Sequence, residues 1–165
     1  MRLRFADATE SDAAEIAALR SAAGENLTAT YGRGHWSGGL TEKGVLSGIR
    51  NARVLLARRG KQLAGTLLLI PKKPWAIDTS YFTPAKRPLY LLNMAVAPAL
   101  QRRGVGRALL RHAAAVARDW PSDAIRLDAY DVGAGAGGFY ASCGYREVGR
   151  VSYRGVPLIY YEFVL

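Results

Sequence analysis

The largely apolar run Leu89–Val96 and the residues that follow it constrain the fold most strongly. Pro98 closes the run, and a short basic segment with two glycines, Gln101–Gly106, leads into a helical pattern. A strand that is apolar on both faces belongs inside a sheet. At the start of the following helix, the first N–H groups lack carbonyl partners and the helix dipole favours negative charge. The stretch therefore predicts a buried strand, a glycine turn and an anion site at the helix N-terminus.

Composition narrows the class of protein. The chain has 165 residues, of which half are apolar, and we predict a single domain, residues 1–165, with a real hydrophobic core. The net charge is +10, which favours polyanionic partners such as nucleic acid, anionic membranes or phosphorylated cofactors. The one cysteine, Cys143, excludes an internal disulfide and any multi-cysteine metal site, and we expect no metal.

We recognise no targeting signal in the N-terminal residues. The first ten residues, MRLRFADATE, lack the apolar core of a signal peptide. No apolar run approaches the roughly 20 residues needed to cross a bilayer. We therefore expect a cytoplasmic protein without a membrane partner.

Hydrophobic periodicity predicts alternating strands and helices along the whole chain. In the first half we expect a strand at Arg2–Ala6, a helix at Ala13–Ala23 that either stops at Gly24 or extends further, a glycine- and aromatic-rich loop to Gly39, a helix from Thr41 to Asn51, and a hairpin of Arg53–Arg59 and Gln62–Ile70. In the second half we expect a long connection at Pro71–Pro88, the strand Leu89–Val96, a helix from Gly104 to Trp120, a strand at Ala124–Tyr130, a short helix at Phe139–Cys143, and a closing hairpin of Tyr145–Tyr153 and Val156–Leu165.

Two segments in this order carry a family resemblance. Gln101-Arg102-Arg103-Gly104-Val105-Gly106 matches a Q/R-x-x-G-x-G/A turn, and Phe139–Tyr145 resembles an F-Y-x-x-x-G-F/Y segment. Together they resemble the GNAT superfamily of acyl-CoA-dependent N-acyltransferases. The resemblance implies an α/β fold of the α+β type: a mixed, mostly antiparallel sheet of about seven strands, splayed between its central strands, with about four flanking helices.

The resemblance also implies acetyl-CoA as the co-substrate. Its pyrophosphate would lie at the glycine turn, where glycines let the backbone approach and arginines add positive charge. Its pantetheine would pair with backbone groups of the central strand, much as another strand would. The cofactor-binding residues implied in this way are Met94, Ala95, Val96, Gln101, Arg102, Arg103, Gly104, Val105, Gly106, Arg107, Ala136 and Tyr140.

The implied reaction is transfer of an acetyl group to a primary amine by direct attack within a ternary complex. Tyr140 would protonate the leaving thiolate or donate a hydrogen bond to it, and the backbone N–H of Met94 would stabilise the thioester carbonyl oxygen. A phenol pKa of about 10 exceeds a thiol pKa of about 8.5, which favours the hydrogen-bonding role. Cys143 occupies a variable position of the motif and has no activating partner, so an acyl-cysteine intermediate is not expected.

Two features of the implied site stay open. Family members often carry an asparagine seven residues before the tyrosine, where this chain has Gly133, so another group must replace the missing amide. The amine must also lose a proton, and no acidic residue lies within Leu89–Val96. The candidates for the general base are Asp128, Asp131, His35 and Glu162.

Other functions were weighed against this one. Gly133–Gly138 formally matches a dinucleotide fingerprint, but the helix after it is too short for a parallel crossover. A catalytically degenerate CoA-binding domain and a basic nucleic-acid-binding module remain as alternatives. We expect an amine-bearing small molecule or peptide as partner, no specific nucleic acid, and a homodimer through the closing hairpin as a further hypothesis. Aromatic residues of segments 26–40 and 71–88 and of the final hairpin would either line a pocket that selects the acceptor or cover the sheet as part of the core.

Overall fold

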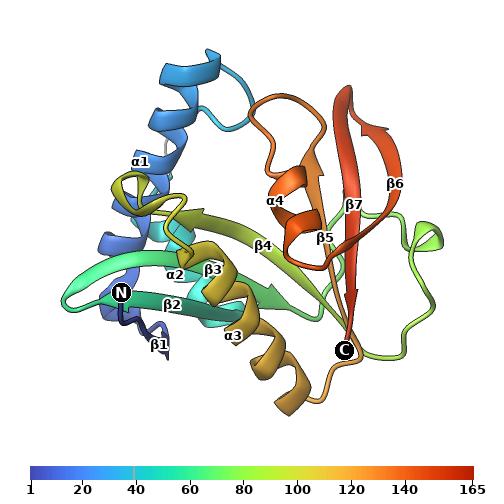
Figure 1. The fold of residues 1–165 in the computed structure, drawn as a ribbon, viewed down its shortest axis with the longest axis horizontal. Helices are drawn as coiled ribbons and strands as arrows, with labels where there is room; N and C mark the ends of the chain where they lie inside the picture. The colour runs from blue at the N-terminus through green and yellow to red at the C-terminus, as the bar shows by residue number, and fades with distance from the viewer. Residues whose placement is uncertain (39) are drawn as a thin grey trace. The chain divides into compact units, whose positions relative to one another are not determined.

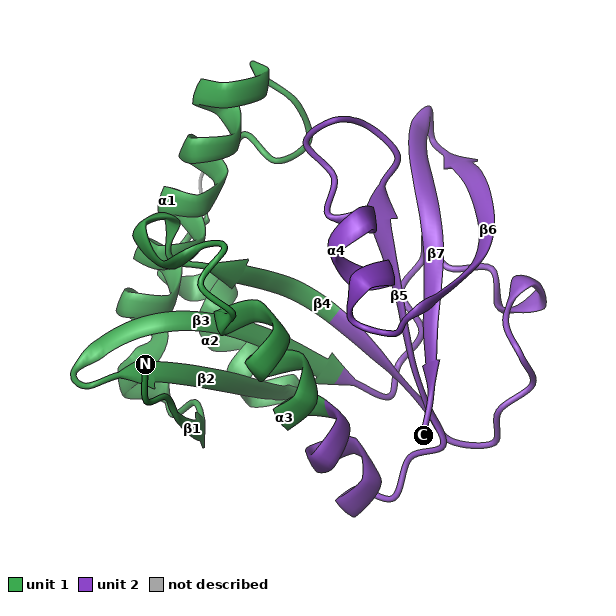
Figure 2. Ribbon diagram, in the orientation of Figure 1, with its two compact units in different colours: residues 1–69, 92–113 green, residues 70–91, 114–165 purple. Residues whose placement is uncertain are grey.

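The structure, a computed structural model, describes residues 1–38 and 40–165. Gly39, part of the predicted glycine-rich loop, lies outside the described residues. The chain divides into two compact units (Figure 2). Unit 1 holds residues 1–69 and 92–113, and unit 2 holds residues 70–91 and 114–165.

The described residues form seven strands and four α-helices (Figure 1). The strands are β1 (Arg4–Asp7), β2 (Arg53–Arg59), β3 (Gln62–Ile70), β4 (Pro88–Val96), β5 (Ala124–Tyr130), β6 (Arg146–Tyr153) and β7 (Val156–Val164). The helices are α1 (Ala13–Tyr31), α2 (Glu42–Asn51), α3 (Val105–Asp119) and α4 (Gly137–Ser142), with three short 3-10 turns, η1 (Glu10–Asp12), η2 (Thr79–Tyr81) and η3 (Pro98–Leu100).

The strands are ordered β1-β2-β3-β4-β5-β7-β6 in a seven-stranded sheet. Strands β4 and β5 run parallel, whereas the pairs β1–β2, β2–β3, β5–β7 and β6–β7 are antiparallel. The ladder between β4 and β5 joins Pro88–Tyr90 to Ala124–Arg126. The predicted mixed, mostly antiparallel sheet of seven strands with four helices is confirmed.

Unit 1 is built on the β2–β3 hairpin, whose turn contains Gly60 in the left-handed region at φ +59°. Strand β2 is buried from Val54 to Ala57 and β3 from Leu63 to Leu69, and their leucines form the core with the apolar stripe of α3. A Cβ added to Gly65 of β3 would lie 3.2 Å from the Ala95 carbonyl oxygen and 3.3 Å from the Val105 side chain. The glycine therefore allows β4 and α3 to lie close against β3.

Of the two ends predicted for the first helix, the extension beyond Gly24 is the one observed. Helix α1 continues to Tyr31 and ends at Gly32, whose φ of +82° suits a helix terminus. A Cβ on Gly24 would lie 2.7 Å from the Trp36 carbonyl oxygen, so the glycine serves a close crossing of the following loop. One glycine in a helix interior costs about 1 kcal/mol, which packing of the helix against its neighbours can offset.

In unit 2, the long connection before β4 is ordered and lies over β5 and β7. The Tyr160 hydroxyl donates to the Ala76 carbonyl and accepts from the Asp78 N–H at 3.1 Å. Further along, Glu162 accepts hydrogen bonds from the N–H and hydroxyl of Thr83 at 3.1 and 2.6 Å. The segment predicted as a long connection is therefore hydrogen-bonded to β7 at Tyr160 and at Glu162.

Candidate functional site

Strand β4 departs from regular geometry within the predicted cofactor strand. Asn93 has φ +56°, in the left-handed region that asparagine tolerates better than most residues. Met94, Ala95 and Val96 follow directly and are half-buried. Such backbone outliers inside a strand are found mostly at functional sites. Asn93 is not among the site residues predicted from the sequence, although it is the one amide side chain in the run Leu89–Val96.

The end of β4 is tied both to β3 and to the turn. The Ala97 N–H donates to the Ala64 carbonyl at 2.9 Å. The Gln101 side-chain amide donates to the Val96 carbonyl at 3.2 Å. Gln101, predicted as a cofactor contact, therefore also holds the turn in register with the strand that precedes it.

The turn reaches α3 through two residues in the left-handed region. Arg102 has φ +59° and Gly104 has φ +84°. A Cβ on Gly104 would meet nothing within 4 Å, so the backbone conformation, and not lack of space, requires glycine there. The Ala108 N–H bonds to the Gly104 carbonyl at 3.0 Å, so the first turn of α3 begins directly at this glycine. The first N–H groups of a helix are the ones available to an anion.

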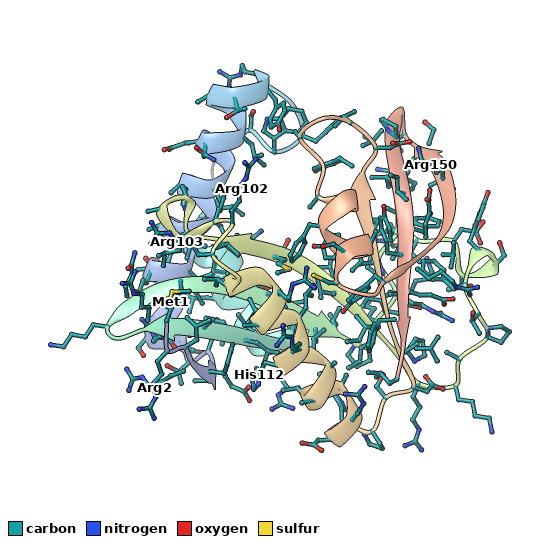
Figure 3. The ribbon with its side chains drawn as sticks, in the orientation of Figure 1. Met1, Arg2, Arg102, Arg103, His112 and Arg150 are labelled. Atoms are coloured by element: carbon teal, nitrogen blue, oxygen red, sulfur yellow. The ribbon has the colours of Figure 1, made fainter. Side chains whose placement is uncertain are left out.

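Positive charge surrounds this turn. Arg102, Arg103 and Arg107 are exposed, and Figure 3 shows the first two on the segment that joins β4 to α3. The sequence from Pro88 to Arg118 contains no aspartate or glutamate. The helix dipole adds further positive potential at the N-terminus of α3. The donor set of backbone N–H groups and guanidinium groups fits a pyrophosphate.

The second part of the predicted site lies in unit 2, on α4. Tyr140 is buried, and its N–H donates to the Ala136 carbonyl at 3.2 Å. Its ring lies 5.9 Å from the ring of Tyr145 and 6.0 Å from that of Tyr161, measured between centroids. Burial, followed by the charges of Asp128 and Cys143, raises the pKa of Tyr140 above its ordinary value. The phenol therefore stays protonated and can donate a hydrogen bond.

The loop before α4 is ordered by its own backbone at the place where the family often has an asparagine. The Gly135 N–H donates to the Val132 carbonyl at 2.9 Å. A Cβ on Gly135 would collide with the Tyr130 carbonyl oxygen. The loop that contains Gly133 thus folds back on the end of β5. Position 135 has no room for a Cβ, a steric requirement that the sequence pattern alone did not reveal.

The candidates for the general base have different surroundings. Asp131 pairs with Arg150 at 3.4 Å, and His35 is exposed on the loop before α2. Glu162 is buried and held by Thr83 and by Arg146 at 2.5 Å. Burial opposes its ionisation, but these hydrogen bonds prevail and hold the pKa of Glu162 below its ordinary value. Asp128 is half-buried, and burial raises its pKa.

The structure makes Glu162 a stabilising residue, and its replacement by glutamine should show this. Because the pKa of Glu162 is lowered by folding, its ionised form stabilises the protein above its ordinary pKa of 4.5, and this contribution is lost as the pH falls through the folded-state value. Glu162→Gln should lower the free energy of unfolding at pH 7 by about 1–2 kcal/mol, as expected for losing charged hydrogen bonds.

Urea denaturation at pH 7 and pH 3.5 measures this difference. The matched control is Glu10→Gln, which removes an exposed ion pair with Arg50 at 2.7 Å and should leave stability almost unchanged. An equal loss for Glu162→Gln at both pH values would contradict a role for its charge.

The described residues separate the predicted site into two sets. Unit 1 contains the strand and turn residues, which are Met94, Ala95, Val96 and Gln101 to Arg107. Unit 2 contains Ala136 and Tyr140. Among residues 1–38 and 40–165, no three histidine, cysteine, aspartate or glutamate side chains are grouped to hold a metal ion. None of the described helices is long and apolar enough to span a bilayer.

Comparison with solved structures identifies the fold. A ribosomal-protein-alanine N-acetyltransferase from Brucella melitensis aligns over all of both chains with a TM-score of 0.75 and 20% identity. YncA from Salmonella typhimurium, solved with its cofactor acetyl-CoA, aligns over 99% of this chain and 94% of its own with a TM-score of 0.71 and 17% identity. An IAA acetyltransferase from Bacillus cereus aligns over 99% and 100%, with a TM-score of 0.67 and 17% identity. At these identities the likeness establishes a shared fold.

Sequence comparison adds the family. No curated protein sequence matches the chain. The sequence profile of the acetyltransferase (GNAT) family matches residues 25–145, a range that includes β4, the arginine-glycine turn and α4 with Tyr140. The profile covers well over half of the chain and both motifs, and the structures share its fold, so the chain belongs to the acetyltransferase (GNAT) family.

Proposed function

We propose that the protein is an N-acetyltransferase that transfers the acetyl group of acetyl-CoA to a primary amine by direct attack within a ternary complex. The observation that carries the proposal is the turn between β4 and α3. There Arg102 and Gly104, whose backbones are in the left-handed region, lie within a basic segment that the family profile covers. This donor set suits a pyrophosphate, and the family to which the chain belongs carries out acetyl transfer.

In this proposal the chain's own residues bind the co-substrate and stabilise charge. The backbone of Met94–Val96 holds the pantetheine, and the turn residues Gln101–Arg107 hold the pyrophosphate. Bound acetyl-CoA supplies the acetyl group as a thioester. The Met94 N–H donates to the thioester carbonyl oxygen, where negative charge develops.

Tyr140 acts at the sulfur. Because its pKa is raised by burial, its hydroxyl is a weaker acid than an ordinary phenol and much weaker than a thiol. Tyr140 therefore stabilises the departing sulfur by donating a hydrogen bond, and complete proton transfer from the phenol is the less favourable course. Ala136 contributes as the residue whose carbonyl receives the Tyr140 N–H.

A thiol-release assay tests the proposal. Purified protein is mixed with acetyl-CoA and one of four amines: tyramine, L-lysine, spermidine or a short peptide with N-terminal alanine. The last is included because a structural neighbour is named as an alanine N-acetyltransferase. We expect amine-dependent thiol release with at least one acceptor, and an acetylated product by mass spectrometry. Acetyl-CoA binding by calorimetry without thiol release from any amine would instead favour a CoA-binding domain without catalysis.

A further inference from the structure

The carboxylates of unit 2 differ in one respect. Most are held by other groups: Asp78 accepts from Ser80, Asp123 from the N–H groups of Lys86 and Arg87, Glu162 from Thr83, and Asp131 and Glu147 pair with Arg150. Asp119, the last residue of α3, is exposed to water. Asp128 is half-buried, and within residues 70–91 and 114–165 its carboxylate makes neither a hydrogen bond nor an ion pair.

Strand geometry places Asp128 on a defined face of β5. Side chains alternate along a strand, so Arg126, Asp128 and Tyr130 share one face. In the ladder with β7, Asp128 lies directly opposite Tyr160. The ladder with β4 reaches Arg126, so Asp128 is the next side chain on this face beyond its end.

The neighbouring groups on this face come from the ordered connection before β4. The Arg126 guanidinium donates to the Thr83 carbonyl at 2.8 Å and lies 5.1 Å from the Phe82 ring centroid. The Tyr160 ring lies 5.2 Å from the Phe82 ring and 5.5 Å from the Tyr81 ring. Asp128 is therefore flanked by aromatic rings, and the one arginine two residues away is bonded elsewhere.

The electrostatics agree with this geometry. Burial raises the pKa of Asp128, and no cation among residues 70–91 and 114–165 lowers it. The titratable groups that face it are Tyr130 on β5, Tyr160 on β7 and Tyr140 on α4. Burial is the largest cause that raises the pKa of each, and the Asp128 charge raises each further, whereas the hydrogen bond from the Asp78 N–H lowers the pKa of Tyr160. A desolvated carboxylate without a counter-ion is costly, and proteins retain such groups mainly where they function.

We infer that Asp128 binds the ammonium group of the acceptor and removes its proton, so that the acceptor class is a cationic primary amine. This inference rests on the proposed acetyltransferase function. The ammonium would supply the counter-ion that Asp128 lacks, and the faces of Tyr130 and Tyr160 would favour a cation beside it.

The proton and bond changes balance. One proton passes from the ammonium nitrogen to the Asp128 carboxylate, which leaves a neutral amine with a free lone pair. A nitrogen–carbon bond forms to the acetyl carbonyl carbon of acetyl-CoA as the carbon–sulfur bond breaks. A second proton from nitrogen ends on the sulfur as the free thiol, and Asp128 releases its proton to solvent.

The experiment compares wild type with Asp128→Asn, using the amine from the four-member panel that gives the fastest thiol release. At pH 7 we expect Asp128→Asn to lower kcat/KM for the amine by about 100-fold, the lower range for losing a general base. The loss should shrink above the pKa of the amine, because the acceptor is then already neutral. Asp128→Glu should restore part of the activity. The dissociation constant of acetyl-CoA, measured by calorimetry, should stay within threefold of wild type.

A readout independent of turnover separates this role from a structural one. Carbon-13 NMR of the Asp128 carboxyl, recorded without acetyl-CoA, should show its titration midpoint move to lower pH when the same amine is added. Because folding raises the pKa of Asp128, its ionised form reduces stability at pH 7, and Asp128→Asn should unfold at or above the wild-type temperature.

The outcomes are distinct for the two proposals. The matched control is Asp119→Asn, which removes an exposed carboxylate of the same unit and should keep wild-type kcat/KM. Suppose that the wild type is active and that Asp128→Asn is equally active, or that the variant loses the same share of kcat/KM at every pH. Either result would overturn the role of Asp128 and leave the acetyltransferase proposal intact. Wild type that acetylates none of the amines would overturn both.

Discussion

Replacing Gly104 by aspartate should weaken acetyl-CoA binding by about 10²- to 10³-fold. Gly104 has φ +84°, a conformation that strains a residue with a Cβ by about 1–3 kcal/mol. The new carboxylate would also lie where the proposal puts a pyrophosphate, so like charges would repel. Both effects act on the same binding equilibrium, which isothermal calorimetry with acetyl-CoA measures directly.

The matched control for Gly104 is Gly155→Asp. Gly155 has φ +79° in the turn between β6 and β7, and a Cβ there also meets nothing within 4 Å. The control therefore introduces the same charge with nearly the same backbone strain in a turn other than the one between β4 and α3. Equal loss of acetyl-CoA affinity in the two variants would mean that strain alone was measured, and the pyrophosphate site would have to be placed elsewhere.

Replacing Tyr140 by phenylalanine should lower kcat by about 10²- to 10³-fold, the effect expected when a hydrogen-bond donor to developing negative charge is removed. The affinity for acetyl-CoA should change little, because the ring and its contacts with Tyr145 and Tyr161 remain. Steady-state thiol release gives kcat, and calorimetry gives the affinity. Unchanged turnover would remove Tyr140 from the mechanism.

Tyr145→Phe is the matched control for this variant. Tyr145 is also buried, its pKa is also raised by burial, and within the described residues its hydroxyl has no hydrogen-bond partner. Its loss removes an unsatisfied polar group, so Tyr145→Phe should be as active as wild type and at least as stable. A similar fall in kcat for both variants would point to general repacking around α4.

Local sequence pattern predicted most elements because their signals are local. The β2–β3 hairpin, β5 and α2 appear at the residues expected, since alternation, the Gly60 turn and the Thr41 cap act within a few residues. The end of α1 shows where local pattern is not sufficient to predict an element's bounds. Whether a glycine ends a helix or permits a close crossing depends on Trp36, which lies beyond the helix itself.

The residues of the candidate site also fall into those that local sequence predicts and those that it does not. The turn residues Gln101–Gly106 and the tyrosine of α4 could be named from motifs, because their spacing is written in the chain. The left-handed backbone conformation at Asn93, the steric need for Gly135 and the distinction between Glu162 and Asp128 could not be predicted in this way. They depend on the backbone path and on groups distant in sequence, such as Thr83 and Arg146 around Glu162.

The sequence by itself therefore determined the family, the order of the elements and the turn between β4 and α3, because hydrophobic period, glycine position and basic charge are properties of neighbouring residues. Only the tertiary structure decided which carboxylates are neutralised. Folding brings Thr83 and Arg146 to Glu162 and Arg150 to Asp131, and it leaves Asp128 half-buried without a cation from residues 70–91 and 114–165. Partnership between charges is set by contacts across strands and layers, and no spacing along the chain encodes it.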